Sequence, residues 1–159
     1  MGVVGGAVVR LLALDPGGSS GWSVWAYDAT TPLRHIEHGT IPGGKDGFID
    51  WALRRRGEFD IVVSESFVLD GRTAQPDITP LRIETAIDMI FGQWGDGVPV
   101  IYQRNFMKNH APDDLLKRLG LWWSGAGHDR DSARHALAWA KTTKHIPTLK
   151  WMYGRKENA

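Results

Sequence analysis

The sequence predicts an α/β fold in which helices flank one five-stranded mixed sheet, and a single domain over residues 1–159. Short apolar runs rich in β-branched and aromatic residues recur along the first two thirds of the chain. The first three runs are separated by turns, whereas segments with helical spacing of apolar residues precede the last two. A length of 159 residues and a hydrophobic content of 42% suit one globular domain with one core.

Each element depends on a local pattern in the chain. Val8 to Leu14 is an apolar run typical of a buried central strand, and Pro80 after Thr79 indicates a helix with Thr79 as its N-cap. The predicted strands cover residues 8–14, 21–27, 34–41, 60–64 and 98–103. The predicted helices cover residues 46–56, 79–93, a segment from 112 onward, and 129–144. The segment 146–159 has no clear pattern.

The predicted order of elements is β-β-β-α-β-α-β-α-α. Three strands joined by short turns form an antiparallel meander, and a strand reached through a helix lies parallel to the first strand. Few compact folds begin in this way, and the ribonuclease H-like fold is the best known of them. The sequence therefore predicts a ribonuclease H-like fold.

Composition excludes several classes of protein and site. The chain has no cysteine, so it has neither disulfides nor thiolate metal sites. Its apolar runs are far shorter than the roughly 20 residues that span a bilayer. Its apolar start is interrupted by Arg10 and follows no basic segment. We therefore expect a strand there rather than a signal peptide, and a cytoplasmic location.

Charge is divided unequally along the chain. Residues 1–103 contain 8 Lys and Arg against 13 Asp and Glu, whereas residues 104–159 contain 11 against 5. An acidic first part can hold a cation, and a basic second part can neutralise DNA phosphates. Because ordinary solvated helix faces produce the same division, charge alone leaves nucleic-acid binding open.

Two carboxylates end buried strands of the predicted sheet. Asp15 follows the first strand and begins a glycine-rich turn, and Glu65 follows the fourth strand. If these strands are parallel neighbours, both side chains project from the same edge, where α/β sheets bind their ligands. The alternative is structural, with Asp15 capping its turn and Glu65 at a solvated strand end.

A third group of candidate residues lies near the start of the last predicted helix. His128, Asp131 and His135 are spaced to share one face of a helix, and Arg134 lies beside Asp131. Oxygen and imidazole ligands without thiolate suit Mg²⁺ or Mn²⁺, and Mn²⁺ tolerates the imidazole better. Two such ions could activate a water and stabilise the leaving oxygen of a phosphodiester. In the structural alternative, Asp129 or Asp131 only caps the helix.

Three motifs in this order resemble those of the RuvC family of Holliday junction resolvases, which belongs to the ribonuclease H-like superfamily. LLALDPGGSSGWSVW is similar to the first motif, VVSESF to the second, in which a strand ends in the catalytic Glu, and GHDRDSARHALAWA to the last. The resemblance extends from Leu11 to about Ala140. The small size and the His-x-x-Asp sequence resemble phage-type members, which would place the protein in the cytoplasm of a bacterial host.

The resemblance implies a structure-selective endonuclease that resolves four-way DNA junctions by hydrolysis, with two Mg²⁺ or Mn²⁺ ions in each active site. The sequence leaves open whether Asp129 or His135 contributes to that site. The residues implied as both metal ligands and catalytic residues are Asp15, Glu65, His128 and Asp131.

Branched DNA is the partner that this resemblance implies. Lys108 is similar to a family lysine near the scissile phosphate, and Phe67 is similar to a family aromatic residue that disturbs base stacking near the junction. The full set of predicted DNA-binding residues is Phe67, Arg72, Lys108, Lys117, Arg118, Arg130 and Arg134.

A homodimer is also expected, because resolvases of this family are homodimers whose two-fold axis matches that of a four-way junction. The predicted helix 79–93 is the candidate interface, since Ile83, Ile87 and Ile90 line one of its faces. The alternative is that this stripe belongs to the core of the chain itself.

Other interpretations fit the pattern less well. Ribonuclease H uses a carboxylate from its first helix, where this chain offers Asp46 and Asp50, and transposases place a Glu on the last helix. DPGGSSG could be a phosphate loop of the actin-like ATPase fold, but that fold needs two such domains. We therefore expect no nucleotide cofactor and no thermal shift with ATP. An endonuclease for flaps and forks, or a non-catalytic junction-binding protein, stays open.

Overall fold

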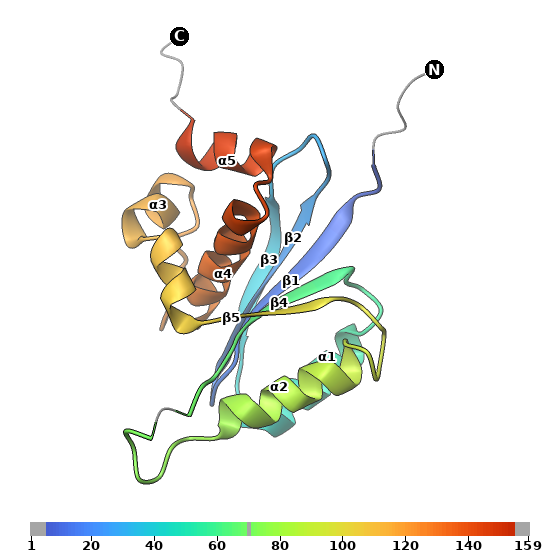
Figure 1. Cartoon of the computed structure of the whole chain (residues 1–159), viewed down its shortest axis with the longest axis vertical. Coiled ribbons are helices and arrows are strands. Elements are labelled where there is room, and N and C mark those ends of the chain that lie inside the picture. Colours follow the sequence, from blue (N-terminus) through green and yellow to red (C-terminus); the bar gives the residue numbers. More distant parts are fainter. Residues whose placement is uncertain (1–5, 70, 155–159) are drawn as a thin grey trace.

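Five strands of the described chain form one mixed sheet, and helices cover both of its faces (Figure 1). The computed structural model describes residues 6–69 and 71–154. The strands are β1 (Val9–Asp15), β2 (Ser20–Tyr27), β3 (Arg34–Ile41), β4 (Ile61–Glu65) and β5 (Val100–Gln103). The helices are α1 (Gly44–Arg55), α2 (Thr79–Ile90), the short 3₁₀ helix η1 (Asn105–His110), α3 (Asp113–Arg118), α4 (His128–Thr142) and α5 (Ile146–Tyr153).

The strands lie in the order β3-β2-β1-β4-β5 across the sheet. β2 pairs antiparallel with both β1 and β3, as predicted for a meander joined by turns. β4 pairs parallel with β1, and β5 pairs parallel with β4. The prediction of an α/β fold on a five-stranded mixed sheet is therefore confirmed.

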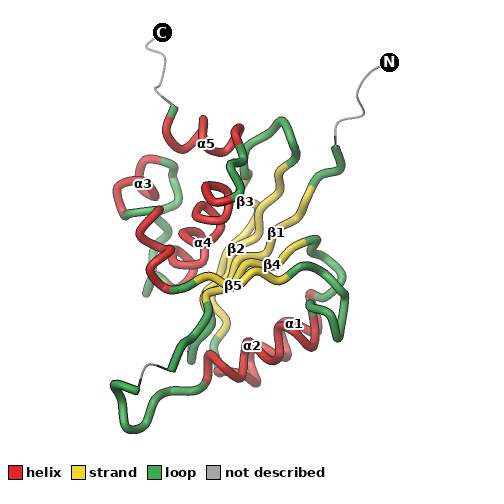
Figure 2. The backbone as a smooth tube through the Cα atoms, in the orientation of Figure 1, coloured by secondary structure: helices red, strands yellow, loops and turns green. Residues whose placement is uncertain are grey.

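Two apolar cores lie on opposite faces of this sheet. α1 and α2 cover one face, and α3, α4 and α5 lie on the other (Figure 2). Successive side chains of β1 alternate between the two cores, with Leu11 and Ala13 facing α4, and Leu12 and Leu14 facing α1 and α2. β1 is the central strand and is buried on both faces, which explains its apolar sequence. No helix in the described part of the chain is both long and apolar enough to cross a membrane.

The start of α2 differs from its prediction. Ile78, not Thr79, holds the N-cap position, and the Asp77 carboxylate accepts the Thr79 N–H at 2.9 Å. A carboxylate just before the helix thus takes the role that the pattern assigned to the Thr79 hydroxyl. The helix ends at Ile90 rather than at the predicted Gln93. Its apolar stripe of Ile83, Ile87 and Ile90 is buried against the sheet, so the stripe is core, and the homodimer stays a prediction.

Two helical segments were missed by the sequence patterns. η1 follows β5 directly, and α5 lies in the segment for which no structure was predicted. α5 is held by long-range contacts: Met152 is fully buried, and an Arg118 guanidinium nitrogen donates to the Met152 carbonyl at 2.7 Å. A helix of eight residues depends on such packing more than on its own propensity, which explains why its sequence alone does not predict it.

α4 reaches the carboxyl edge of the sheet because β2 has a glycine at the crossing point. Gly21 pairs with Asp15, and a Cβ atom at Gly21 would lie 1.8 Å from the His128 carbonyl oxygen. Gly127 precedes the helix with a φ of 99°, a left-handed conformation that favours glycine. These two glycines let the first turn of α4 rest on β2 beside Asp15.

Replacing Gly21 by Ala is therefore expected to destabilise the protein by about 1–3 kcal/mol, the usual range for overpacking, because backbone has to move. Urea unfolding measures this change. Gly18→Ala is the matched control, since a Cβ at Gly18 meets nothing within 4 Å. Equal free energies of unfolding for the two variants would contradict the close contact between β2 and α4.

Candidate active site

Three parallel strands of the sheet end in polar residues at the same edge. β1 ends in Asp15, β4 in Glu65 and β5 in Gln103. The register pairs Glu65 with Gln103, and Asp15 follows the paired residues Leu14 and Ser64. Asp15 and Gln103 are buried, at 8% and 6% exposure. A largely buried polar cluster therefore lies at the carboxyl edge of the sheet, the edge at which α/β sheets bind their ligands.

Asp15 and Glu65 are close enough to affect each other's ionisation. Burial, then the adjacent Glu65 carboxylate and the charge of Asp131, raise the pKa of Asp15 to about 9. Burial also opposes ionisation of Glu65, but His135, Asp15 and Lys108 beside it outweigh that effect and lower its pKa to about 2. At neutral pH the two carboxyl groups therefore hold one proton and one negative charge.

Asp131 comes to this pair from the first turn of α4. Lys108, in η1, places its ammonium nitrogen 3.3 Å from Glu65 Oε1 and 3.5 Å from Asp131 Oδ2. Burial disfavours the charge of Lys108, but Glu65 and Asp131 outweigh it and raise the pKa of this lysine. Arg134 donates from Nε to Asp131 Oδ1 at 3.1 Å and so fixes the carboxylate from the other side.

His135 completes the cluster one helical turn after Asp131. Its ring is fully buried, and Nδ1 lies 2.7 Å from Gln103 Oε1. Nε2 lies 3.4 Å from Glu65 Oε1, and neither of these two atoms has a hydrogen-bond partner in the described chain. The sequence singled out His135 only as a further candidate and missed Gln103. A polar residue at the end of the fifth strand was the available signal for Gln103.

The other two candidates in α4 have different surroundings. The Asp129 carboxylate is buried and lies 2.8 Å from His38 Nδ1, and the His38 ring stacks on Trp123 with centroids 3.9 Å apart. Asp129 thus joins α4 to β3. His128 is half-buried in the first turn of α4, with its carbonyl against Gly21, and its role as a ligand stays a prediction. Gly127 is the N-cap of α4, so neither Asp129 nor Asp131 caps the helix.

The residues of this cluster suit a hard or borderline divalent cation. Carboxylate oxygens and an imidazole nitrogen are available. Among the described residues, buried His135 Nε2 has no hydrogen-bond partner, and Glu65 Oε1 has only its ion pair with Lys108. A bound cation would neutralise the negative charge of Asp15 and Glu65 in place of the proton that the two carboxyl groups share. Among the described residues, no group of three or more His, Asp or Glu side chains is arranged to hold a metal ion in this structure.

The free energy of unfolding of the metal-free protein is expected to fall as pH rises from about 4 to 9. The unfolded chain releases the Asp15 proton near 3.8, whereas the folded chain keeps it up to about 9, so folding takes up a proton in this window. Glu65 has the opposite effect, but only below its ordinary value of 4.5.

Thermal unfolding of the metal-free protein in EDTA, at pH values from roughly 5 to 9, measures this dependence. Asp15→Asn is expected to flatten the curve and to raise the melting temperature at the alkaline end. Asp50→Asn, on the exposed surface of α1, serves as control and should keep the wild-type slope. Parallel curves for wild type and Asp15→Asn would contradict the shared proton.

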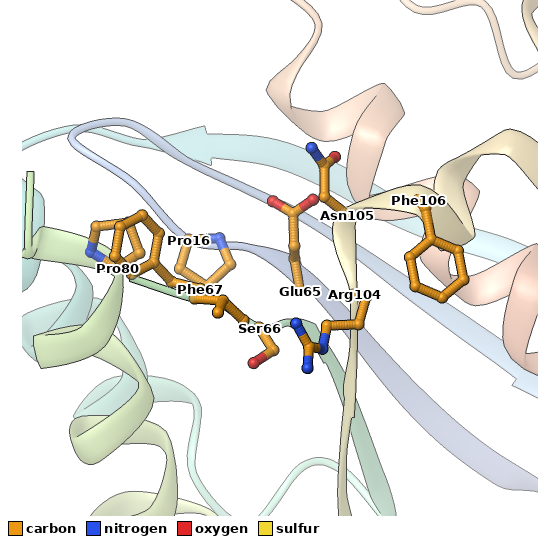
Figure 3. A pocket seen from close by; sticks show the side chains of 9 residues that line it. Pro16, Glu65, Ser66, Phe67, Pro80, Arg104, Asn105 and Phe106 are labelled. Carbon is orange, nitrogen blue, oxygen red and sulfur yellow. The ribbon is translucent and has the colours of Figure 1, made fainter. Parts of the chain in front are cut away.

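A cleft of about 400 Å³ opens beside Glu65. Phe67 and Pro80 lie on one side of Glu65, and Arg104 and Phe106 lie on the other (Figure 3). The predicted DNA-binding residue Phe67 therefore lies next to the catalytic candidate, with its backbone N–H donating to Glu84 at 2.7 Å. Phe106 was not among the predicted DNA-binding residues. Its side chain is 63% exposed, which is unusual for a phenylalanine.

The predicted cationic DNA contacts have four kinds of surroundings. Lys108 belongs to the site itself. Arg134 and Arg118 have protein partners: Arg134 donates to Asp113 at 2.6 Å as well as to Asp131, and Arg118 donates to α5. Lys117 and Arg130 flank the Trp122 ring, at 4.6 and 4.3 Å from its centroid. The remaining cation, Arg72, lies exposed in the segment between β4 and α2.

Comparisons with known proteins bear on the fold. No protein-family model and no curated protein matches the chain. Among solved structures it is similar to Thermus thermophilus RuvC, with a TM-score of 0.65 at 17% identity, over 85% of this chain and 95% of that one. The same RuvC in complex with a Holliday junction substrate gives 0.67 at 17% identity, over 87% and 97%. The chain has the RuvC fold.

The yeast mitochondrial Holliday junction resolvase is a more distant likeness. It has a TM-score of 0.53 at 10% identity, over 89% of this chain and 82% of that one. Likeness to RuvC at these identities establishes the fold, so the ribonuclease H-like prediction is confirmed. The phage-type origin, the cytoplasmic location and the homodimer stay predictions.

Proposed function

We propose that this protein is a metal-dependent endonuclease that resolves four-way DNA junctions. The observation that carries the proposal is the meeting of Asp15, Glu65 and Asp131 around Lys108, at the carboxyl edge of a sheet with the RuvC fold. The structures it resembles are Holliday junction resolvases, and one of them is bound to its junction substrate. Fold and site support the same chemistry.

The metal ions of this proposal are Mg²⁺ or Mn²⁺, two in each active site. Asp15, Glu65, His128 and Asp131 would hold them, and His135 is a further candidate. Bound there, the ions would supply an activated water and neutralise charge on the leaving oxygen of the phosphodiester. This chemistry needs no nucleophilic side chain.

The protein's own residues position the substrate and the ligands. Arg134 holds Asp131 through its Nε and anchors itself on α3 through Asp113, so the carboxylate keeps its direction. Lys108 carries its charge next to two carboxylates, and we assign to it the binding of a phosphate oxygen beside the scissile bond. Its position in η1, directly after β5, ties that charge to the edge of the sheet.

The cleft beside Glu65 suits unstacked bases at the centre of a junction. Phe67 and Phe106 supply aromatic surface on either side of Glu65, and Arg104 supplies a cation that can contact a base or a phosphate (Figure 3). Bases at a branch point stack less completely than bases in a duplex, so they reach such a cleft at lower cost. This gives the proposal its preference for branched DNA.

Cleavage of labelled four-way, flap and linear duplexes with Mg²⁺, Mn²⁺ or EDTA tests this function. The expected result is metal-dependent nicking of the four-way junction in two strands, with little cutting of the linear duplex. Cutting confined to flaps or forks would support the proposed active site but change the proposed substrate to the broader class of branched DNA. Tight junction binding without cleavage under any condition would favour the non-catalytic alternative.

A further inference from the structure

Phe106 presents its ring to solvent at the rim of the cleft beside Glu65. Its side chain is largely exposed, whereas Phe48, Phe59 and Phe91 are buried in the core. Covering an apolar ring of this size is favourable, and a flat ring is covered best by another flat surface. The position of Phe106 therefore suits a ligand that has an aromatic face.

The backbone that carries this ring is held by hydrogen bonds at both ends of η1. The Met107 N–H donates to the Arg104 carbonyl at 3.0 Å, and the N–H of the fully buried Ala111 donates to the Lys108 carbonyl at 3.0 Å. η1 directly follows β5 and packs against α4. Phe106 thus stands on a fixed support, so a ligand that covers its ring pays little for ordering the backbone.

Two cations flank Phe106 along the chain. Arg104, two residues before it, is exposed and forms no ion pair with a carboxylate among the described residues. Lys108, two residues after it, lies beside Glu65. An aromatic ring between two positive charges suits a nucleotide, whose base stacks on the ring and whose phosphates meet the cations. An apolar protein partner would cover the ring but would leave the charge of Arg104 without a counterpart.

A second aromatic residue, Phe67, lines the same cleft on the opposite side of Glu65 (Figure 3). A DNA strand whose scissile phosphate lies at Glu65 and Lys108 places the nucleotides before and after that phosphate on opposite sides of the carboxylate. Because Glu65 lies between the two rings, one base cannot stack on both. Each ring is therefore available to a different base of the strand.

We propose that Phe106 is a specificity-determining residue that stacks on an unpaired DNA base next to the branch point, across the scissile phosphate from the base that Phe67 contacts. The proposal rests on the function proposed above and adds a second base-binding position to that site. Bases differ in how strongly they stack on an aromatic ring, so Phe106 gives the enzyme a base preference on the η1 side of the cut.

Photocrosslinking of the full chain to four-way junctions in EDTA tests this assignment without cleavage. Iododeoxyuridine, which crosslinks to aromatic side chains that stack on it, replaces one nucleotide at a time near the branch point, and mass spectrometry identifies the linked residue. The wild type is expected to link Phe106 from one position and Phe67 from a different position of the same strand. Phe106→Ala should remove only the first crosslink, and Phe67→Ala only the second.

Cleavage of junctions that carry each of the four bases at the Phe106 position measures the preference. Phe106→Ala is expected to reduce the ratio of kcat/KM between the best and the worst base by about 3–10-fold, and Phe106→Tyr should retain it. Tyr153→Ala is the matched control, because Tyr153 is also an exposed aromatic residue but lies on α5. It should leave both crosslinks and the base preference as in the wild type.

These measurements distinguish the inference from the function beneath it. If Phe106 forms no crosslink from any position, or if Phe67 and Phe106 crosslink to the same base, the inference is overturned and the proposed nuclease stands. An unchanged base preference in Phe106→Ala would overturn it as well. A wild type that neither binds nor cuts junctions with Mg²⁺ or Mn²⁺ would overturn both proposals.

Discussion

Replacing Asp15 by Asn is expected to lower junction cleavage by at least about 10²–10³-fold while junction binding stays nearly unchanged. This is the scale of loss when one electrostatic contributor is removed from an active site. Asn is the same size as the protonated Asp15 of the metal-free protein, so the fold should tolerate it. It cannot take up the negative charge that a bound cation requires, so the site should lose its metal.

The melting temperature and a control variant distinguish a loss of catalysis from a loss of folding. Asp15→Asn should melt at least as high as wild type at alkaline pH, because it removes a buried carboxyl group whose ionisation is disfavoured. Asp50→Asn, exposed on α1 at the opposite face of the sheet, should cleave like wild type. Equal cleavage by Asp15→Asn and wild type would remove Asp15 from the site.

Lys108→Met is expected to reduce the rate of cleavage by about 10²-fold, with a smaller effect on binding of the junction. The ammonium of Lys108 lies between Glu65 and Asp131, and in the proposed mechanism it binds a phosphate oxygen next to the scissile bond. Met preserves the length and the apolar stem of the lysine, so the packing of η1 should remain.

Single-turnover cleavage of a labelled junction measures this effect directly. Lys150→Met, on the exposed surface of α5, is the matched control and should cleave at the wild-type rate. Lys108→Arg should restore part of the rate because it retains a positive charge. A Lys108→Met variant that cleaves normally but binds junctions weakly would make this residue a general phosphate contact rather than part of the active site.

The sheet and two of its catalytic candidates were predictable because they depend on local patterns. Apolar runs that end in Asp15 and Glu65 predict buried strands with carboxylates at their ends, and the parallel pairing of β1 and β4 brings those ends together. Gln103 likewise ends β5, but a glutamine at a strand end is common and does not by itself indicate a site. Only its pairing with Glu65 in the sheet places it there.

The candidate residues of α4 could be narrowed to a helix face but not to a turn. Spacing places His128, Asp131 and His135 on one face, and the structure brings Asp131 and His135 to Glu65 and Lys108. Which turn meets the sheet edge depends on the close approach of Gly21 to the start of the helix, a contact between residues more than a hundred positions apart. No local pattern encodes that distance.

Partners of the basic residues also required the tertiary structure. Arg134 was expected on DNA, yet its guanidinium contacts Asp131, Asp113 and the Ala111 carbonyl, because η1 packs against α4 and places the start of α3 beside it. A phosphate contact from Arg134 would have to replace one of these three. Composition shows that the second part of the chain is basic but does not show which of its cations are already engaged.

Cleavage of a supercoiled plasmid that extrudes a cruciform tests the central claim most directly, because it separates coordinated resolution from simple nicking. With Mn²⁺ or Mg²⁺, this protein is expected to convert the plasmid to linear product, since both opposing strands are cut within the lifetime of one complex. Asp15→Asn and EDTA should each abolish the linear product. Accumulation of open circles alone, or metal-independent cutting, would contradict a metal-dependent junction resolvase.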